Sequence, residues 1–126
     1  MKSPLHHFSR RHFLKTSGAF AAFSILSSRS WANSPNGRLQ VAQVGVGGRG
    51  SVNLKSIVRL ENVDVVGLCD VDSVALNEAA ILCPKAIRFR DYRKMLEAMD
   101  SRIDAVLVST PDHMHAPVST AAMELG

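Results

Sequence analysis

A short glycine-rich segment has the spacing of a loop that binds nucleotide phosphates. Its glycines follow a G-x-G-x-x-G pattern directly after an apolar run, and the segment consists of Gly45, Val46, Gly47, Gly48, Arg49 and Gly50. In such a turn, Gly45 allows a tight change from strand to helix, and Gly47 lets the backbone approach a pyrophosphate without a Cβ in the way. Gly50 lets the helix pack closely on the strand. The N–H groups at the start of that helix would face the phosphates. The pattern predicts dinucleotide binding.

An acidic residue lies at the distance from this loop that dinucleotide binding requires. Asp70 ends a second apolar run, Val63–Cys69, and is 20 residues beyond Gly50. A carboxylate at the end of a second parallel strand can accept hydrogen bonds from both hydroxyls of an adenosine ribose, and it repels a 2′-phosphate. The spacing therefore favours NAD over NADP. The alternative is that Asp70 caps a helix or shapes a turn, and Asp72 is predicted to cap the helix that follows.

A third polar segment follows another apolar run, Ile103–Ser109. It reads Thr-Pro-Asp-His-Met-His-Ala from Thr110 to Ala116. Because parallel strands end at the same edge of a sheet, this loop is expected on the ligand side, near the glycines. His113 and His115 are separated by one residue and fit either a surface or the start of a helix. They are not predicted to bind zinc, because no third ligand follows at metal spacing.

The elements that must position these residues alternate between strand and helix. Apolar runs predict strands at 39–44, 63–69, 86–89 and 103–109. Helical patterns predict helices at 49–60 and 73–83, another that follows an N-cap at Asp91, and a fourth that begins near Ala116 or Pro117. This order predicts an α/β fold, a Rossmann-type doubly wound parallel sheet that is incomplete. We expect the first strand to lie between the second and the fourth.

Composition and charge separate the first 32 residues from the rest. The chain of 126 residues has a net charge of +4, with 46% hydrophobic and 21% charged residues, which is typical of one soluble globular domain. Residues 1–32 contain five basic residues and no acid, whereas the remainder has ten basic and eleven acidic residues, a net charge of −1. No basic nucleic-acid face is therefore expected. Cys69 and Cys83 lack metal-ligand spacing and are predicted to be buried thiols.

The first residues resemble a twin-arginine export signal. Residues 9–15 read Ser-Arg-Arg-His-Phe-Leu-Lys, and an apolar run of 13 residues follows at 16–28. Ser30-Trp31-Ala32 offers small residues for cleavage before Asn33. A membrane anchor is the alternative, but the run is shorter than the roughly 20 residues that a spanning helix needs. We predict a signal peptide at 1–32, a linker at 33–38 and a nucleotide-binding domain at 39–126.

This signal implies a partner and a location. The protein is expected to engage the bacterial twin-arginine export machinery and to be periplasmic or otherwise exported. That route moves folded proteins, whose cofactors often travel with them. Since the periplasm offers little free nicotinamide cofactor, the signal and the glycine loop support each other.

Three motifs together resemble the N-terminal NAD(P)-binding domain of the Gfo/Idh/MocA family, named for glucose–fructose oxidoreductase and inositol dehydrogenase. They are the glycine loop, Cys69-Asp70-Val71-Asp72, and the segment from Ile103 to His115, which is close to the family signature I-D-A-V-x-I-x-T-P-x-x-x-H. The resemblance covers residues 39–126. It implies that Asp70 holds the adenosine ribose, that Thr110 and Pro111 line the cofactor, and that His115 lies near the nicotinamide. The pyrophosphate loop would consist of Gly45, Gly47, Gly48, Arg49 and Gly50.

The sequence also departs from the family pattern. In this family the fourth helix leads to a Gly-Lys-His-Val strand, a Glu-Lys-Pro motif whose lysine serves catalysis, and a second α+β domain with the substrate pocket. The sequence ends at Gly126, before these features. The resemblance therefore implies a fragment of a longer enzyme, with no catalytic residue of its own and with the fourth strand as a hydrophobic edge.

Three functions remain open at this point. The first hypothesis is an exported NAD(P)-dependent oxidoreductase that transfers hydride to or from a sugar, polyol or related carbohydrate. The second arises from exported relatives that resemble Gly47-x-Arg49-Gly50 and cleave glycosides with tightly held NAD and no net redox change. There, transient oxidation acidifies a neighbouring C–H and permits elimination. The third is a non-catalytic NAD-binding module. The substrate and the oligomeric state, a homo-oligomer included, stay open.

Overall fold

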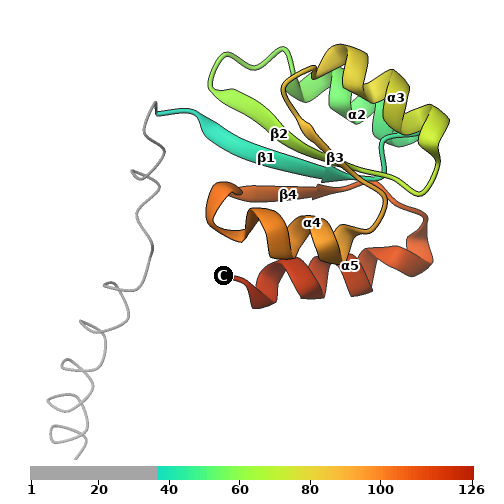
Figure 1. The fold of residues 1–126 in the computed structure, drawn as a ribbon, viewed down its shortest axis with the longest axis vertical. Helices are drawn as coiled ribbons and strands as arrows, with labels where there is room; N and C mark the ends of the chain where they lie inside the picture. Colours follow the sequence, from blue (N-terminus) through green and yellow to red (C-terminus); the bar gives the residue numbers. More distant parts are fainter. Residues whose placement is uncertain (1–36) are drawn as a thin grey trace, which may run out of the picture. The chain divides into compact units, whose positions relative to one another are not determined.

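Residues 37–126 are described in a computed structural model, and they form a sheet flanked by helices (Figure 1). The predicted signal peptide and most of the linker lie outside the described residues. The elements are, in order, β1 (Leu39–Val44), α2 (Arg49–Ile57), β2 (Val63–Cys69), α3 (Ser73–Leu82), β3 (Ile87–Phe89), α4 (Tyr92–Met99), the 3-10 helix η2 (Asp100–Arg102), β4 (Ala105–Val108) and α5 (Asp112–Glu124). The predicted alternation of strand and helix is confirmed.

The four strands form one parallel sheet in the order β3-β2-β1-β4. Val44, at the end of β1, lies beside Cys69 of β2 and Val108 of β4, so these three strands end at the same edge. The expected position of the first strand, between the second and the fourth, is confirmed, and β3 lies at the side, next to β2. Loops that follow β1, β2 and β4 are therefore brought together.

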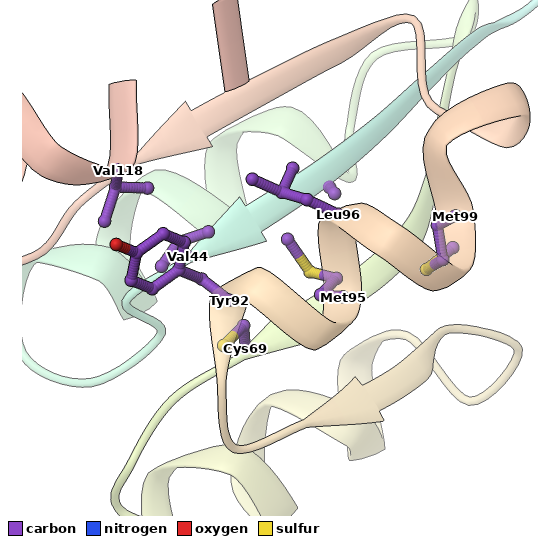
Figure 2. Packing of buried hydrophobic residues seen from close by; sticks show 8 residues of the cluster. Val44, Cys69, Tyr92, Met95, Leu96, Met99 and Val118 are labelled. Atoms are coloured by element: carbon purple, nitrogen blue, oxygen red, sulfur yellow. The ribbon is translucent and has the colours of Figure 1, made fainter. Parts of the chain in front are cut away.

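Helices cover both faces of the sheet and bury two apolar clusters. On one face, α4 and α5 pack over Ala42 and Val44 of β1, and Figure 2 shows Met95, Leu96 and Met99 of α4 in this cluster. On the other face, α2 and α3 pack over β2, and the buried members of this cluster are Val46, Leu54, Leu68, Leu76, Ala79 and Cys83. Each large apolar side chain buried in this way contributes about 1.5–3 kcal/mol to stability. Helices on both faces therefore hold the sheet in place.

Two helices begin at aspartates that the sequence predicted as caps. The Asp72 side chain accepts a hydrogen bond from Val74 N at 2.8 Å, and the Asp91 side chain accepts one from Arg93 N at 2.9 Å. Each bond satisfies one of the free N–H groups in a first helical turn. Both predicted caps are confirmed.

Several boundaries differ from the prediction, most clearly at α5. This helix begins at Asp112 rather than near Ala116 or Pro117, so both histidines of the predicted loop lie in its first turns. Pro117 is inside the helix, where its missing N–H removes one intrahelical bond. Proline is generally favoured in the first turn of a helix, which is why the sequence predicted that this helix begins near Ala116 or Pro117. Likewise, α2 ends at Ile57 and β4 covers only 105–108.

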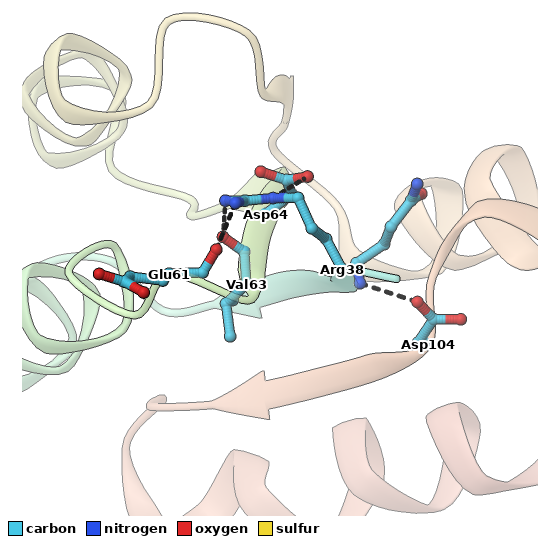
Figure 3. Close-up of polar contacts among 6 residues, drawn as sticks. Arg38, Glu61, Val63, Asp64 and Asp104 are labelled. Atoms are coloured by element: carbon cyan, nitrogen blue, oxygen red, sulfur yellow. Dashed lines mark hydrogen bonds and ion pairs between the residues drawn. The ribbon is translucent and has the colours of Figure 1, made fainter. Parts of the chain in front are cut away.

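Polar contacts join the opposite, amino-terminal edge of the sheet (Figure 3). Arg38 donates from Nε to Asp64 Oδ2 at 2.9 Å, from Nη2 to Val63 O at 2.9 Å, and from Nη1 to Glu61 O. Asp104, just before β4, accepts from Gln40 N at 2.8 Å. These bonds link β1 to β2 and β4 at the edge away from the glycine loop, and they leave the other edge free to carry a site.

Candidate functional site

The glycine loop has the shape that its sequence predicted. Gly45 has a φ of 84°, and a Cβ there would lie 2.6 Å from Ser109 C and O. A Cβ on Gly50 would lie 2.2 Å from Gly45 O. Contacts this short exclude any side chain at either position. The tight turn and the close packing of α2 on β1 therefore both depend on glycine.

Of the two central glycines, Gly48 leaves room on the outer side of the loop, whereas Gly47 does not. Gly48 is the N-cap of α2, with a φ of 49°, and a Cβ there would meet nothing within 4 Å. A Cβ on Gly47 would come within 3.2 Å of Ala75 Cβ. Arg49, exposed, is the first residue of α2. The start of α2 thus offers N–H groups and the positive end of the helix dipole in open space, which suits an anion.

The carboxylate of Asp70 lies directly beside this loop. Its Oδ2 accepts hydrogen bonds from Val46 N at 2.8 Å and from Gly47 N at 3.2 Å, and its Oδ1 accepts one from Asp72 N at 2.9 Å. The sequence placed Asp70 near the loop by spacing alone, whereas these bonds show that it also fixes the loop's backbone. Its role toward a ribose stays a prediction.

The connection from β4 to α5 closes the other side of the loop. Ser109 N donates to Val44 O at 2.8 Å, and Ser109 Oγ accepts from Asn53 Nδ2 of α2 at 2.9 Å. The next residue, Thr110, has a buried Oγ1 with no hydrogen-bond partner. Pro111 then forms the N-cap of α5. The predicted residues Thr110 and Pro111 therefore lie on the glycine-loop side of the sheet, although what they bind is untested.

The two histidines are both exposed but differ in their hydrogen bonds. His115 Nε2 lies 2.6 Å from Thr110 O, so its ring is hydrogen-bonded back across the first turn of α5. His113 is exposed, and no group of three His, Cys, Asp or Glu side chains among residues 37–126 is arranged to hold a metal ion. The bond fixes the His115 ring beside Thr110. A contact with nicotinamide stays a prediction.

Two residues near the loop were not singled out from the sequence. Gln43, in β1, is buried and hydrogen-bonded to the loop, and Asn53 joins α2 to Ser109. The available signal for Gln43 was a polar residue within an apolar run that predicted a strand.

Cys69 was predicted correctly as a buried thiol, and burial, with Asp70 and Asp91 nearby, raises its pKa to about 12. It is therefore protonated at neutral pH and unsuited to act as a nucleophile.

Residues 39–126 match the Gfo/Idh/MocA family, an oxidoreductase family with an NAD-binding Rossmann fold. The chain belongs to this family. The match covers all the strands and helices described above, so the family resemblance inferred from the three motifs is confirmed.

The relatives are named as glycosyl hydrolase family 109 proteins or as an alpha-N-acetylgalactosaminidase. A glycosyl hydrolase family 109 protein of Stenotrophomonas maltophilia is 38% identical over 129 residues, which cover 93% of this chain and 28% of the relative. An alpha-N-acetylgalactosaminidase of Shewanella oneidensis is 29% identical, over 97% of this chain and 32% of the relative. The chain thus spans about a third of the length of these curated relatives.

Solved structures share the fold. A myo-inositol 2-dehydrogenase from Lactobacillus plantarum superimposes with a TM-score of 0.65 at 26% identity, over 71% of this chain and 26% of that one. A scyllo-inositol dehydrogenase from Lactobacillus casei, solved with NAD(H) and scyllo-inositol, gives a TM-score of 0.65 at 21% identity, over the same shares. Each likeness covers about a quarter of a longer chain.

Proposed function

We propose that this domain binds NAD in an enzyme that cleaves glycosides without net oxidation or reduction. The observation that carries the proposal is the meeting of the glycine loop, Asp70 and the Ser109–Thr110 connection at one edge of the sheet. Asp70 Oδ2 lies 2.8 Å from Val46 N, and a Cβ on Gly45 would lie 2.8 Å from Thr110 N. Membership of an NAD-binding family supports the cofactor, and the names of the curated relatives support the reaction.

The residues present fit an extended dinucleotide. Gly47 and Gly48 leave the backbone bare at the start of α2, where N–H groups favour the charge of a pyrophosphate. The Asp70 carboxylate offers acceptors for ribose hydroxyls and repels the 2′-phosphate of NADP. Bound NAD would supply a reversible hydride acceptor. The chain's own part in the reaction is to bind and orient that group, since the described residues include no buried acid–base pair beside the loop.

Two measurements on the full-length product of the gene test this proposal. The purified protein is expected to release NAD on denaturation or to bind added NAD. With p-nitrophenyl α-N-acetylgalactosaminide as a probe taken from a relative's name, it is expected to release nitrophenol and sugar while NADH absorbance stays flat. A folded protein that neither contains nor binds NAD would overturn the proposal.

A second candidate is net dehydrogenation of a polyol. Its support is the fold and 26% identity shared with the myo-inositol 2-dehydrogenase. In that case the same protein, given NAD and an inositol, would accumulate NADH in proportion to the oxidised product. Turnover of the glycoside probe without NADH would favour the first candidate, because a net dehydrogenase must reduce one NAD for each substrate molecule.

A further inference from the structure

A buried glutamine lies in the strand beneath the glycine loop. Gln43 is 0% exposed, and its neighbours across the sheet are Leu68 in β2 and Leu107 in β4. An amide placed between leucines costs free energy unless its polar atoms are hydrogen-bonded. A leucine or valine would fill this position in an ordinary buried strand. The amide therefore calls for a specific physical reason.

The side-chain amide of Gln43 binds both ends of the loop. Its Nε2 donates to Gly45 O and to Gly50 O, each at 2.8 Å. A primary amide nitrogen carries two hydrogens, so one nitrogen can serve both carbonyls. Gly45 opens the G-x-G-x-x-G pattern and Gly50 closes it in the first turn of α2. One side chain thus bridges the two glycines that leave no room for a Cβ.

The bridge also sets the direction of the Val46 N–H in the loop. Gly45 O and Val46 N belong to one planar peptide unit, in which the carbonyl and the N–H point in opposite directions. Gln43 holds the carbonyl, and Asp70 Oδ2 accepts from the N–H at 2.8 Å. Without the bond from Gln43, Gly45 O would lose the donor that holds this peptide in its orientation.

We propose that Gln43 is a positioning residue for the nucleotide-binding loop. It keeps the Gly45–Val46 peptide with its carbonyl toward α2 and its N–H toward Asp70, so that the loop and its bond to Asp70 are in place before a ligand arrives. Preorganisation of this kind raises affinity because less order is lost on binding. The consequence for affinity rests on the proposed binding of NAD, whereas the consequence for the loop does not.

The test compares two Gln43 variants with a control in the full-length product of the gene. Gln43→Met keeps the length and removes the donors, and Gln43→Asn keeps the amide but withdraws it by one methylene. Met99→Ala is the control, because Met99 is 1% exposed in the cluster on the opposite face of the sheet. For each protein we measure hydrogen–deuterium exchange without ligand, in the peptides that cover residues 44–52. The Kd for NAD is measured separately for each.

We expect both Gln43 variants to exchange the Val46 and Gly47 amides about tenfold faster than wild type and to bind NAD about tenfold more weakly. Met99→Ala is expected to lower Tm while leaving both readouts near wild type. A wild-type protein that does not bind NAD would end the proposed function, and the exchange data would still decide the role of Gln43. Wild-type exchange in both folded variants, or loss of the fold in both, would overturn the inference.

Discussion

Gly50 is the position in the loop where an added side chain meets the most resistance. A Cβ there would lie 2.2 Å from Gly45 O and 2.8 Å from Gly45 C, which are backbone atoms and cannot turn aside. Gly50→Ala is therefore expected to lower the free energy of unfolding by about 1–3 kcal/mol. Urea unfolding measures this loss. Ser51→Ala, one residue further along α2, serves as the control and is expected to stay within about 0.5 kcal/mol of wild type.

Asp70 is expected to affect both cofactor affinity and cofactor choice. Asp70→Ser removes the acceptor for Val46 N and Gly47 N and the charge that disfavours a 2′-phosphate. Loss of charge-assisted hydrogen bonds predicts about ten- to hundredfold weaker NAD binding, with a smaller loss for NADP. Titration calorimetry with both nucleotides gives the ratio. An unchanged preference for NAD over NADP would count against Asp70 as the ribose residue.

Cys69 links stability to alkaline pH. Its pKa is raised from an ordinary 9.0 to about 12, first by burial and then by the carboxylates of Asp70 and Asp91. Above about pH 9 the unfolded chain loses this proton while the folded chain keeps it, so the free energy of unfolding falls as pH rises. The drop in Tm between about pH 8 and pH 10 is expected to be smaller in Cys69→Ala than in wild type. Equal drops would contradict the shift.

At the scale of elements, α4 depends on its cap. The Asp91 side chain accepts from Arg93 N at 2.9 Å at the start of the helix that carries the buried Met95, Leu96 and Met99. Asp91→Ala is expected to cost about 1 kcal/mol, because that N–H then lacks its partner. Asp91→Asn keeps an acceptor and is expected to cost only a few tenths of a kcal/mol. Urea unfolding of the two variants separates the cap from the charge, and similar losses in both would argue against the cap.

The strands and their order were predictable from the sequence because their signals are local. Long apolar runs mark strands buried on both faces, and right-handed crossovers leave few arrangements for the alternating elements. The glycine spacing similarly predicted the turn that Gly45 and Gly50 form. The strands and the turn depend on neighbouring residue types alone, and the strand order follows from the crossover rule.

Other features depend on contacts between residues far apart in the sequence, and local patterns could not predict them. Nothing in the spacing indicates that Asp70 accepts bonds from the loop or that Gln43 donates to it, because each bond depends on the final position of two backbones. The start of α5 was misjudged because Pro117 was taken as a first-turn residue, whereas the helix already begins at Asp112. Local propensity gives way to tertiary structure at these places.

At the scale of the whole molecule, the signal peptide stays a prediction, since residues 1–36 lie outside the described structure. We expect Arg10→Lys with Arg11→Lys to keep the protein in the cytoplasm, because the export machinery reads the arginine pair and not charge alone. Lys2→Arg is the control and is expected to leave export unchanged. Immunoblots of periplasmic and cytoplasmic fractions measure the outcome, and normal export of the double variant would remove the twin-arginine assignment.

The position of β1 in the middle of the sheet also affects how the chain is made. The first strand to be synthesised must wait for β4, since Val44 pairs with Val108 of β4 as well as with Cys69 of β2. Until the ribosome has produced β4, one side of β1 has no partner and the domain cannot close. If the predicted leader requires a folded passenger, export cannot start before the residues around Val108 have been made.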